Sequence, residues 1–287
     1  MPELPEVETV RRGLAPHLVD KRLVRVIARR PDLRFPLPEG FVQRLTGARV
    51  IGLSRRGKYM LAALDRDQTL VMHLGMTGRF TIEAQGAVEA PGEFALAEPA
   101  DPKHAHIIFE TEAGTAITYF DARRFGFMDL VETANLETTR RFAAMGPEPL
   151  GLAFDAAYLA HAFADRRQGA KTLLLDQSVV AGLGNIYVCE ALHRARVSPS
   201  KPAADIGPRA LSALVRSIRA VLEEAIAAGG STLRDYASAE GAMGYFQHDF
   251  RVYGREGQPC PAPRCRGVVS RLVQAGRSTF HCPVCQR

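Results

Sequence analysis

The chain has 287 residues, a formal net charge of +6 and a sequence isoelectric point of about 9.2. Hydrophobic residues make up 46% and charged residues 24%, which excludes disordered, low-complexity and collagen-like classes and predicts one or two globular domains. No stretch approaches the roughly 18–20 apolar residues of a membrane helix, and the N-terminus carries acids where a secretory signal is basic. We therefore expect a cytoplasmic protein.

The charge excess lies at the C-terminal end of the chain. Residues 251–287 contain seven arginines and one acid, which gives +6, whereas the first 250 residues balance 30 basic against 30 acidic side chains. Four of the five cysteines fall in the same segment. The pattern favours a polyanion such as nucleic acid as the partner of this segment, the alternative being a basic tail that is merely solvated.

The first half of the chain begins as a helix and continues as strands. Apolar Val7, Val10 and Leu14 recur at helical spacing after Pro5, which predicts a helix over residues 3–14. Short β-like stretches predict strands at 22–28, 48–53, 58–64, 69–74, 105–110 and 116–120. We expect these strands to form a sandwich. Residues 84–103 have no consistent period and several Pro and Gly, so they predict a surface excursion.

The second half is helical and ends in the cysteine segment. Helices are predicted at 154–164 and 185–196, and a continuous apolar stripe predicts a longer one over 211–226, ended by Gly229 and Gly230. The sequence GPEPLG at 146–151 indicates a linker. The predicted fold class is α+β with two domains: an N-terminal helix and β-sandwich (1–135), a linker (136–150), a helical domain (151–250) and a terminal cysteine module (251–287).

The cysteine module has the spacing of a structural zinc site. Cys260 and Cys265 are separated by four residues, Cys282 and Cys285 by two, and the two pairs by sixteen. Two close pairs across a short hairpin can place four thiolates around one zinc ion. The alternative, two disulfides, is disfavoured in a reducing cytosol. The fifth cysteine, Cys189, is expected to be a small buried residue.

The N-terminus can supply a nucleophile. Removal of the initiator Met would leave Pro2 with a free secondary amine, next to Glu3 and Glu6. An α-amino group has a pKa of about 8, so a useful fraction is unprotonated near neutral pH and can condense with a sugar aldehyde. Taken alone, however, the same residues are an ordinary helix start.

Six motifs, in order along the chain, resemble the bacterial formamidopyrimidine-DNA glycosylase family. They are PELPEVETVRRGL (2–14), HLGMTGRF (73–80), DARRFG (121–126), LLLDQSVVAGLGNIYVCEAL (173–192), GGSTLRDY (229–236) and FQHDFRVYGREGQPC (246–260). The resemblance implies a monomeric two-domain enzyme in which a helix-two-turn-helix element and a zinc finger follow the β-sandwich, with DNA in the cleft between the domains. It implies excision of oxidised purines, notably 8-oxoguanine and formamidopyrimidines, from duplex DNA, followed by β- and δ-elimination at the abasic site.

The resemblance also implies roles for individual residues. Pro2 would attack C1′ of an extruded nucleotide and Glu3 would move protons. Lys58 and Arg277 match residues of the elimination chemistry that also contact phosphate. Met76, Arg123 and Phe125 match the residues that fill the space of the flipped base, with Arg123 bonded to the orphaned cytosine.

Further residues match or lie at DNA-contact positions of the family. These are His73, His104, Arg166, Lys171 and Asn185, the last in a Gly-rich turn that opens a helix, together with Tyr236 in the region that closes over the everted base. Taken singly, each histidine is more often a core or surface residue. The sequence leaves open whether Thr77 helps to read the damaged base.

Two departures from the family pattern concern the metal site. The first cysteine pair is separated by four residues, including Pro261 and Pro263, where two are usual, and His281 stands where an aromatic residue commonly precedes the third cysteine. His281 is therefore an alternative ligand. Two other functions stay open: an endonuclease VIII-like glycosylase for oxidised pyrimidines, and a catalytically silent protein that binds damaged DNA.

Overall fold

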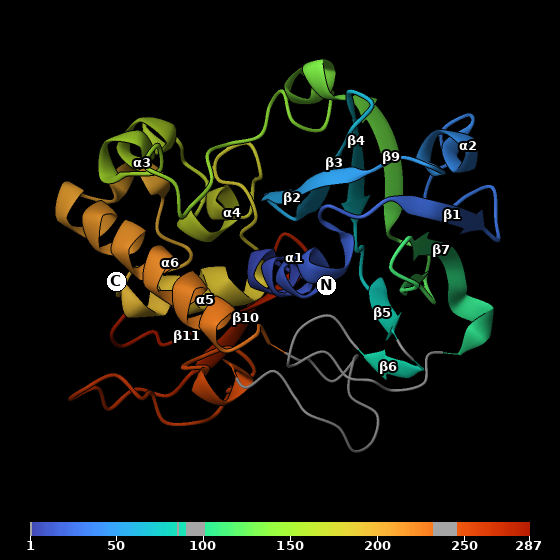
Figure 1. Cartoon of the computed structure of the whole chain (residues 1–287). Helices are drawn as coiled ribbons and strands as arrows, with labels where there is room; N and C mark the ends of the chain where they lie inside the picture. Colours follow the sequence, from blue (N-terminus) through green and yellow to red (C-terminus); the bar gives the residue numbers. More distant parts are fainter. Residues whose placement is uncertain (1, 85, 90–100, 232–245) are drawn as a thin grey trace. The chain divides into compact units, whose positions relative to one another are not determined.

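The computed structural model describes residues 2–84, 86–89, 101–231 and 246–287 (Figure 1). The chain divides into two compact units. The first comprises Met1–Ala143 and Ala228–Tyr245, and the second comprises Ala144–Ala227 and Phe246–Arg287. The short segment 228–231 thus belongs to the first unit, although it follows the longest helix of the second. The domain boundaries predicted at residues 135, 150 and 250 remain predictions from the sequence.

The first unit opens with α1 (Leu4–Leu18), which confirms the predicted N-terminal helix. The helix continues past residue 14 because Leu14 and Leu18 extend its buried face. Near its first turn, the carboxylate of Glu8 accepts hydrogen bonds from Arg11 and Arg12 and lies 3.3 Å from Arg55 of β2 (Val50–Arg56). Burial alone would raise the pKa of Glu8, but the three arginines outweigh that effect and lower the pKa to about 2. The carboxylate therefore joins helix and sheet as an anion.

Two antiparallel sheets make up the rest of the first unit. One has the order β1 (Leu23–Ala28), β7 (Ala105–Thr111), β8 (Ala116–Phe120), β5 (Arg79–Ala84), β6 (Ala87–Glu89), and the other β2 (Val50–Arg56), β3 (Tyr59–Leu64), β4 (Gln68–His73), β9 (Phe127–Glu132). All six predicted strands are present. The structure adds β5, β6 and β9, of which β6 lies inside the predicted surface excursion as a three-residue strand with Val88 exposed.

One hydrophobic core lies between the two sheets. It joins α1 residues such as Val7 and Leu14 to Met60 and Met72 of one sheet and Phe109 of the other. Apolar residues from both sheets meet in one cluster, as expected of a sandwich, so the predicted architecture of the N-terminal half is confirmed. The short helix α2 (Phe41–Leu45) and the 3-10 helices η1 (Pro102–His104) and η2 (Thr133–Thr138) complete this unit.

The second unit is helical up to its cysteine module. It contains α3 (Ala156–Phe163), α4 (Ala170–Leu174), α5 (Asn185–Arg194), the 3-10 helix η3 (Ala203–Asp205) and α6 (Pro208–Ala227). The three predicted helices correspond to α3, α5 and α6. Residues Leu211, Leu214, Ile218 and Leu222 of α6 are buried, as the apolar stripe predicts. None of the helices described in the structure is long and apolar enough to span a membrane.

The C-terminal module is a two-stranded hairpin that packs on the helical part of the same unit. The chain reaches it through η5 (Phe246–Asp249), and the hairpin consists of β10 (Ser270–Gln274) and β11 (Arg277–His281). Val252 and Val269 form a small core with Cys189 of α5, which is buried as predicted.

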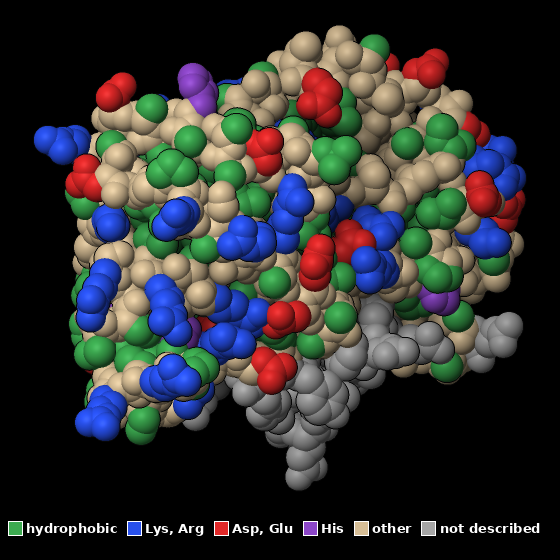
Figure 2. Space-filling view, turned by 90° about the vertical axis from the view of Figure 1, so that its left-hand side faces the viewer, with side chains coloured by type: hydrophobic (Ala, Val, Ile, Leu, Met, Phe, Trp, Pro, Cys, Tyr) green, Lys and Arg blue, Asp and Glu red, His purple; other side chains and the backbone are tan. Residues whose placement is uncertain are grey.

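In the space-filling view, Lys and Arg side chains are spread over the visible face with Asp and Glu among them (Figure 2).

Candidate functional site

The N-terminal residues are held in a defined position by the first turn of α1. Glu3 is the N-cap, with 3% of its surface exposed, and Pro2 before it is half-buried. The backbone N–H of Glu3 donates to Glu6 Oε2 at 2.8 Å, one half of a capping box. Pro2 is therefore attached to a rigid helix end.

Glu6 also binds the segment that returns from the second half of the chain. Its Oε1 accepts from the N–H of Ser231 at 2.8 Å and from the Ser231 hydroxyl at 3.0 Å. Gly230 has φ +87°, and a Cβ atom there would lie 3.0 Å from Glu6 Oε1, so the close approach favours glycine. The sequence placed Glu6 near Pro2 without giving it a role. In the structure its carboxylate joins the N-terminus to Gly230 and Ser231.

Lys58 lies in the turn just before β3, and His73 is the last residue of the neighbouring strand β4. Lys58 is 7% exposed and precedes β3, whose first residue, Tyr59, pairs with His73 at the end of β4. The His73 ring stacks on Phe127, with centroids 5.4 Å apart, and its Nδ1 accepts the N–H of Gly75 at 3.0 Å. The acceptor role of Nδ1 leaves the ring proton on Nε2.

The pKa of His73 is lowered to about 4, by burial first and then by the positive charges of Lys58, Arg34 and Arg141. The neutral ring is therefore the form present near neutral pH. Because the folded pKa lies below the ordinary value of 6.5, the unfolded chain binds more protons between pH 6.5 and 4, and the stability contributed by neutral His73 is lost as pH falls through that window.

Replacing His73 by glutamine is expected to reduce this pH dependence. The free energy of unfolding of the unmodified protein should fall by about 1–2 kcal/mol more between pH 7 and pH 5 than that of His73→Gln. Urea denaturation at both pH values, followed by far-ultraviolet circular dichroism, measures the difference. Glu8, with its pKa near 2, titrates below this window in both proteins. An identical pH response of the two proteins would contradict a neutral, buried His73.

Met76, Arg123 and Phe125 lie on two turns of the first unit, at 74–78 and 121–126. Met76 is half-buried, whereas Arg123 is exposed and Phe125 is 41% exposed. The guanidinium of Arg123 lies over the Phe125 ring, 4.8 Å from its centroid. The backbone oxygen of His104, in η1, accepts the N–H of Asp121, which places His104 beside the second turn. The structure thus gathers four of the predicted DNA-contact residues.

Lys171 and Asn185 meet at one carbonyl oxygen of the hairpin. Lys171 of α4 is fully buried, and its Nζ donates to Ser278 O at 3.1 Å and to Thr279 Oγ1 at 2.6 Å. Asn185, the first residue of α5, donates from Nδ2 to the same Ser278 O at 2.9 Å. Both side chains, predicted as DNA contacts, therefore hold the backbone of β11 at Ser278.

Arg277 is the first residue of β11 and is exposed at the end of the hairpin. It pairs with Gln274 across Ala275 and Gly276, both of which have positive φ (47° and 72°). Two such residues form the tight turn that matches the twist of a hairpin. The bonds from Lys171 and Asn185 to Ser278, its immediate neighbour, fix the backbone that carries the Arg277 guanidinium.

The structure says little about two of the predicted DNA contacts, Arg166 and Tyr236. Arg166 lies in an exposed turn after α3, where its backbone N–H donates to Phe163 and its carbonyl accepts from Ala204. The backbone contacts of Arg166 therefore tie it to Phe163 and Ala204 and not to the other predicted contacts. Tyr236 lies outside the described residues.

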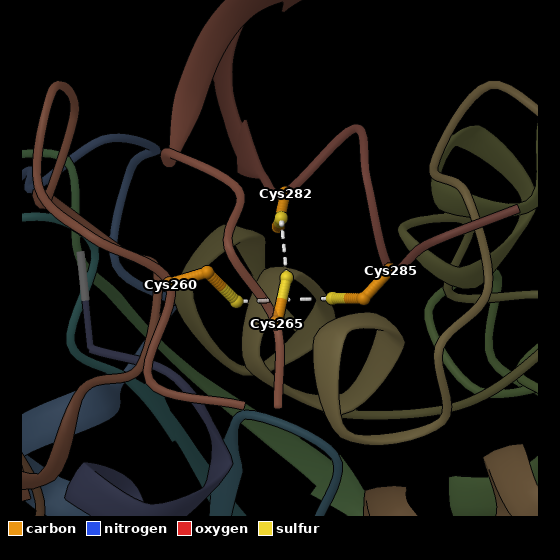
Figure 3. Close-up of side chains that lie close together, drawn as sticks. All are labelled: Cys260, Cys265, Cys282 and Cys285. Atoms are coloured by element: carbon orange, nitrogen blue, oxygen red, sulfur yellow. Dashed lines mark hydrogen bonds between the residues drawn. The ribbon is translucent and has the colours of Figure 1, made fainter. Parts of the chain in front are cut away.

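The four predicted metal ligands converge (Figure 3). The Sγ atoms of Cys260, Cys265, Cys282 and Cys285 all lie within 4.8 Å of one another, with 3.8 Å between Cys260 and Cys285 and 3.7 Å between Cys265 and Cys282. Four sulfurs bound tetrahedrally at about 2.3 Å from a metal are about 3.8 Å apart. The cluster fits a tetrahedral metal ion, and the cysteines are free thiols, so the two-disulfide alternative is wrong.

The unusual spacing of the first pair does not disturb the cluster. The N–H of Cys260 donates to Gly267 O and that of Cys265 to Ala262 O, while Arg264 takes a left-handed conformation (φ 62°) that absorbs the longer loop. His281 is not a member of the ligand cluster found among the described residues. A histidine does approach the site from outside: His193 Nε2, on α5, lies 3.3 Å from Cys260 Sγ.

The sequence did not reveal one further anchor. Glu190 of α5 is fully buried, and its carboxylate accepts backbone N–H bonds from Arg251, Val252 and Tyr253 at 2.8–3.0 Å. It thereby fixes the point at which the chain enters the cysteine module. A capping-box pattern could have indicated the anchoring role of Glu6, but nothing local marks Glu190, since its partners lie about sixty residues away.

The chain combines an α/β unit with a helical unit that carries a four-cysteine cluster, and comparison with known proteins identifies this combination as a DNA glycosylase fold. The formamidopyrimidine-DNA glycosylase N-terminal domain model matches residues 1–128, and the corresponding H2TH domain model matches residues 145–237. The chain belongs to the formamidopyrimidine-DNA glycosylase family.

Similar proteins span the whole chain. Formamidopyrimidine-DNA glycosylases of Phenylobacterium zucineum and Caulobacter vibrioides are 67% and 65% identical to it over 100% of both chains. Among solved structures, a Lactococcus lactis FPG mutant in complex with Fapy-dG containing DNA matches with a TM-score of 0.85 and 35% identity over 100% of both chains. MutM from Thermus thermophilus matches with a TM-score of 0.82 and 39% identity, covering 99% of this chain and 98% of that one.

Proposed function

We propose that this protein removes oxidised purines, notably 8-oxoguanine and formamidopyrimidines, from duplex DNA and then cleaves the strand at the abasic site. The observation that carries the proposal is the N-terminus. Pro2 precedes a buried Glu3 that caps α1, and Glu6 holds both against Gly230 and Ser231. A capping box is common at helix starts, but here the same Glu6 carboxylate also binds Ser231, 225 residues away in the sequence. Such anchoring would hold the Pro2 amine in place to meet C1′ of a nucleotide.

The first chemical step joins Pro2 to the sugar. After removal of Met1, the lone pair of the Pro2 nitrogen attacks C1′ and the bond from C1′ to the purine breaks, its electron pair leaving with the base, which takes up the proton released from the Pro2 nitrogen. Glu3 protonates the ring oxygen of the sugar as the bond from C1′ to that oxygen opens. The product is an iminium ion between Pro2 and C1′, which acts as an electron sink.

Two eliminations follow from this iminium ion. Loss of a proton from C2′ expels the 3′ phosphate, and loss of a further proton from C4′ expels the 5′ phosphate. Hydrolysis of the iminium then frees Pro2. We assign Glu3 to the proton transfers and Lys58 to phosphate contact and elimination. Arg277 holds the phosphates beside the lesion and assists the second elimination.

Other residues hold the distorted DNA. Phe125, exposed and apolar, is proposed to enter the base stack, Met76 to fill the void, and Arg123 to bind the orphaned cytosine. We propose His73, His104, Arg166 and Asn185 as contacts to the DNA backbone. The ammonium of Lys171 is directed at Ser278 O. We therefore propose that Lys171 acts on the phosphates of the DNA backbone through its positive charge and not by direct contact.

We propose that the cysteine cluster holds one structural zinc ion. Four thiolates at tetrahedral separation, on a short hairpin, are the ligand set that zinc prefers in structural sites. The ion supplies no chemistry to the reaction; it fixes the hairpin from which Arg277 projects. The protein is further proposed to act as a monomer in the bacterial cytoplasm, where its substrate DNA lies.

Borohydride trapping tests the proposed activity. The protein is incubated with duplexes that carry 8-oxoguanine opposite cytosine, an oxidised pyrimidine, an abasic site or no lesion, and then reduced. We expect a covalent adduct through Pro2 with the first and third duplexes. An adduct on the oxidised pyrimidine but not on 8-oxoguanine would establish the endonuclease VIII-like alternative. No adduct on any duplex would leave only a damage-binding protein.

Replacing Arg277 by alanine should weaken DNA binding regardless of sequence. Loss of one phosphate contact reduces the slope of log affinity against log salt concentration by about one. Fluorescence anisotropy with a labelled duplex at several salt concentrations measures the slope. Arg216→Ala is the control, because Arg216 is an exposed arginine of α6 outside the family motifs. A slope unchanged in Arg277→Ala would show that Arg277 does not contact phosphate.

A further inference from the structure

The turns at 74–78 and 121–126 are packed backbone against backbone. A Cβ atom at Gly75 would lie 2.2 Å from the backbone N of Gly126, and one at Gly126 would lie 1.9 Å from the Tyr119 hydroxyl. Gly75 also has φ +64°. Neither position accepts a side chain, so the two glycines allow a contact that fixes one turn against the other.

Asp121 joins the two turns from the inside. It is fully buried, and its Oδ1 accepts the hydroxyl of Thr77 at 2.5 Å. Its Oδ2 accepts the N–H of Gly126 at 2.7 Å and the hydroxyl of Tyr119 at 3.2 Å. A buried carboxylate with three donors resists displacement, because movement of either turn would leave a charge without its hydrogen bonds.

The backbone of Asp121 is fixed as well. Its N–H donates to His104 O at 3.1 Å, and its carbonyl accepts from the N–H of Arg124 at 3.2 Å and lies 2.9 Å from His106 Nε2. Arg124 has φ 55°, a conformation that non-glycine residues rarely adopt. The turn between Asp121 and Arg124 is therefore closed by its own hydrogen bond and ends at a left-handed residue.

Thr77 connects this buried anchor to Arg123. The Thr77 hydroxyl donates to Asp121 and accepts the backbone N–H of Arg123 at 3.1 Å. A hydroxyl can make both bonds at once, whereas the isosteric methyl of valine can make neither. The chain of bonds runs from the core, through one hydroxyl, to the backbone of an exposed arginine.

We infer that Thr77 and Asp121 are positioning residues that place Arg123, and thereby set which base opposite the lesion the enzyme accepts. The inference rests on the role proposed above for Arg123. A guanidinium has donors only. The pairing edge of cytosine offers two acceptors, O2 and N3, beside its donor amine, whereas that of adenine offers a single acceptor, N1, beside its amine. Such a distinction requires the guanidinium to be held within about 0.5 Å of its place.

The test compares Thr77→Val, Thr77→Ser and Arg123→Ala with the unmodified protein. The measured quantity is the ratio of kcat/KM for 8-oxoguanine opposite cytosine to that opposite adenine. In Thr77→Val we expect this ratio to fall by about fivefold, the loss of one hydrogen bond. Thr77→Ser, which keeps the hydroxyl, should retain the ratio. General damage to the fold would reduce both rates alike and leave the ratio unchanged.

Hydrogen exchange in the absence of DNA gives a second readout. The amide of Arg123 should exchange faster in Thr77→Val than in Thr77→Ser or the unmodified protein. If Thr77→Val keeps the original ratio while Arg123→Ala lowers it, the inference is overturned. If Arg123→Ala itself leaves the ratio unchanged, the role of Arg123 has failed instead. In that case hydrogen exchange alone decides whether Thr77 anchors the backbone of Arg123. Unchanged exchange of the Arg123 amide in Thr77→Val overturns this anchoring, and faster exchange supports it.

Discussion

Replacing Pro2 by glycine is expected to reduce excision of 8-oxoguanine by about a thousandfold, the order of effect of a lost catalytic group. The glycine variant still has an amine, but a primary one. Its imine must gain a proton before it becomes an electron sink, whereas the iminium of a secondary amine is charged as soon as it forms. Glycine also loosens the backbone that Glu3 and Glu6 hold. Single-turnover kinetics on a lesion duplex measures the loss.

DNA affinity separates this effect from misfolding. Pro2→Gly should bind the lesion duplex within about threefold of the unmodified protein, because phosphate contacts dominate affinity. The matched control is Pro16→Gly, the same substitution at an exposed proline near the other end of α1. The control should keep its excision rate. Full excision by Pro2→Gly would refute Pro2 as the nucleophile.

Replacing Cys265 by alanine is expected to remove the metal and, with it, most of the DNA affinity. Three thiolates hold zinc less well than four, and in zinc-finger peptides the binding free energy is about 10–16 kcal/mol of folding free energy. We expect zinc content to fall from one equivalent to well below one. Affinity for a lesion duplex should fall about a hundredfold as the hairpin that carries Arg277 loses its fixed shape. Mass spectrometry and anisotropy measure the two quantities.

Cys189→Ala is the matched control for the metal site. Cys189 is buried in α5 and lies outside the ligand cluster, so this variant should keep one equivalent of zinc. Loss of zinc from Cys189→Ala, or its retention in Cys265→Ala, would mean that the ligand set is wrong. If Cys265→Ala loses zinc without any change in DNA affinity, the metal site does not contribute to DNA binding.

The features predicted well from the sequence are those with local signals. The six strands have period-two or continuous apolar patterns, α6 has a long apolar stripe, and the four cysteines stand in two close pairs. The strands β5 and β9 escaped, although each has six residues. Their positions in the sheets depend on pairing with distant strands, since β9 pairs with β4 and β5 with β8. In β5, the sequence RFTIEA does alternate polar and apolar residues, so its local signal is present but short, whereas FMDLVE of β9 has no strict period.

The buried polar anchors were invisible in the sequence. Three charged residues resemble surface residues in sequence, yet all are fully buried: Asp121, Lys171 and Glu190. Each is buried because its partners come from remote segments: Thr77 for Asp121, the 251–253 backbone for Glu190, and β11 for Lys171. A motif identified these positions as important but gave no account of what they touch.

The burial of Lys171 has a consequence for how the second unit melts. Its ammonium donates to Ser278 and Thr279 of the hairpin, from a position with no exposed surface. If the hairpin detached, these bonds would break and leave a charge in an apolar environment, at a cost of several kcal/mol unless water entered. The hairpin and the helices beneath it should therefore unfold in one cooperative transition, and a chelator should lower the melting temperature of the helices together with that of the hairpin.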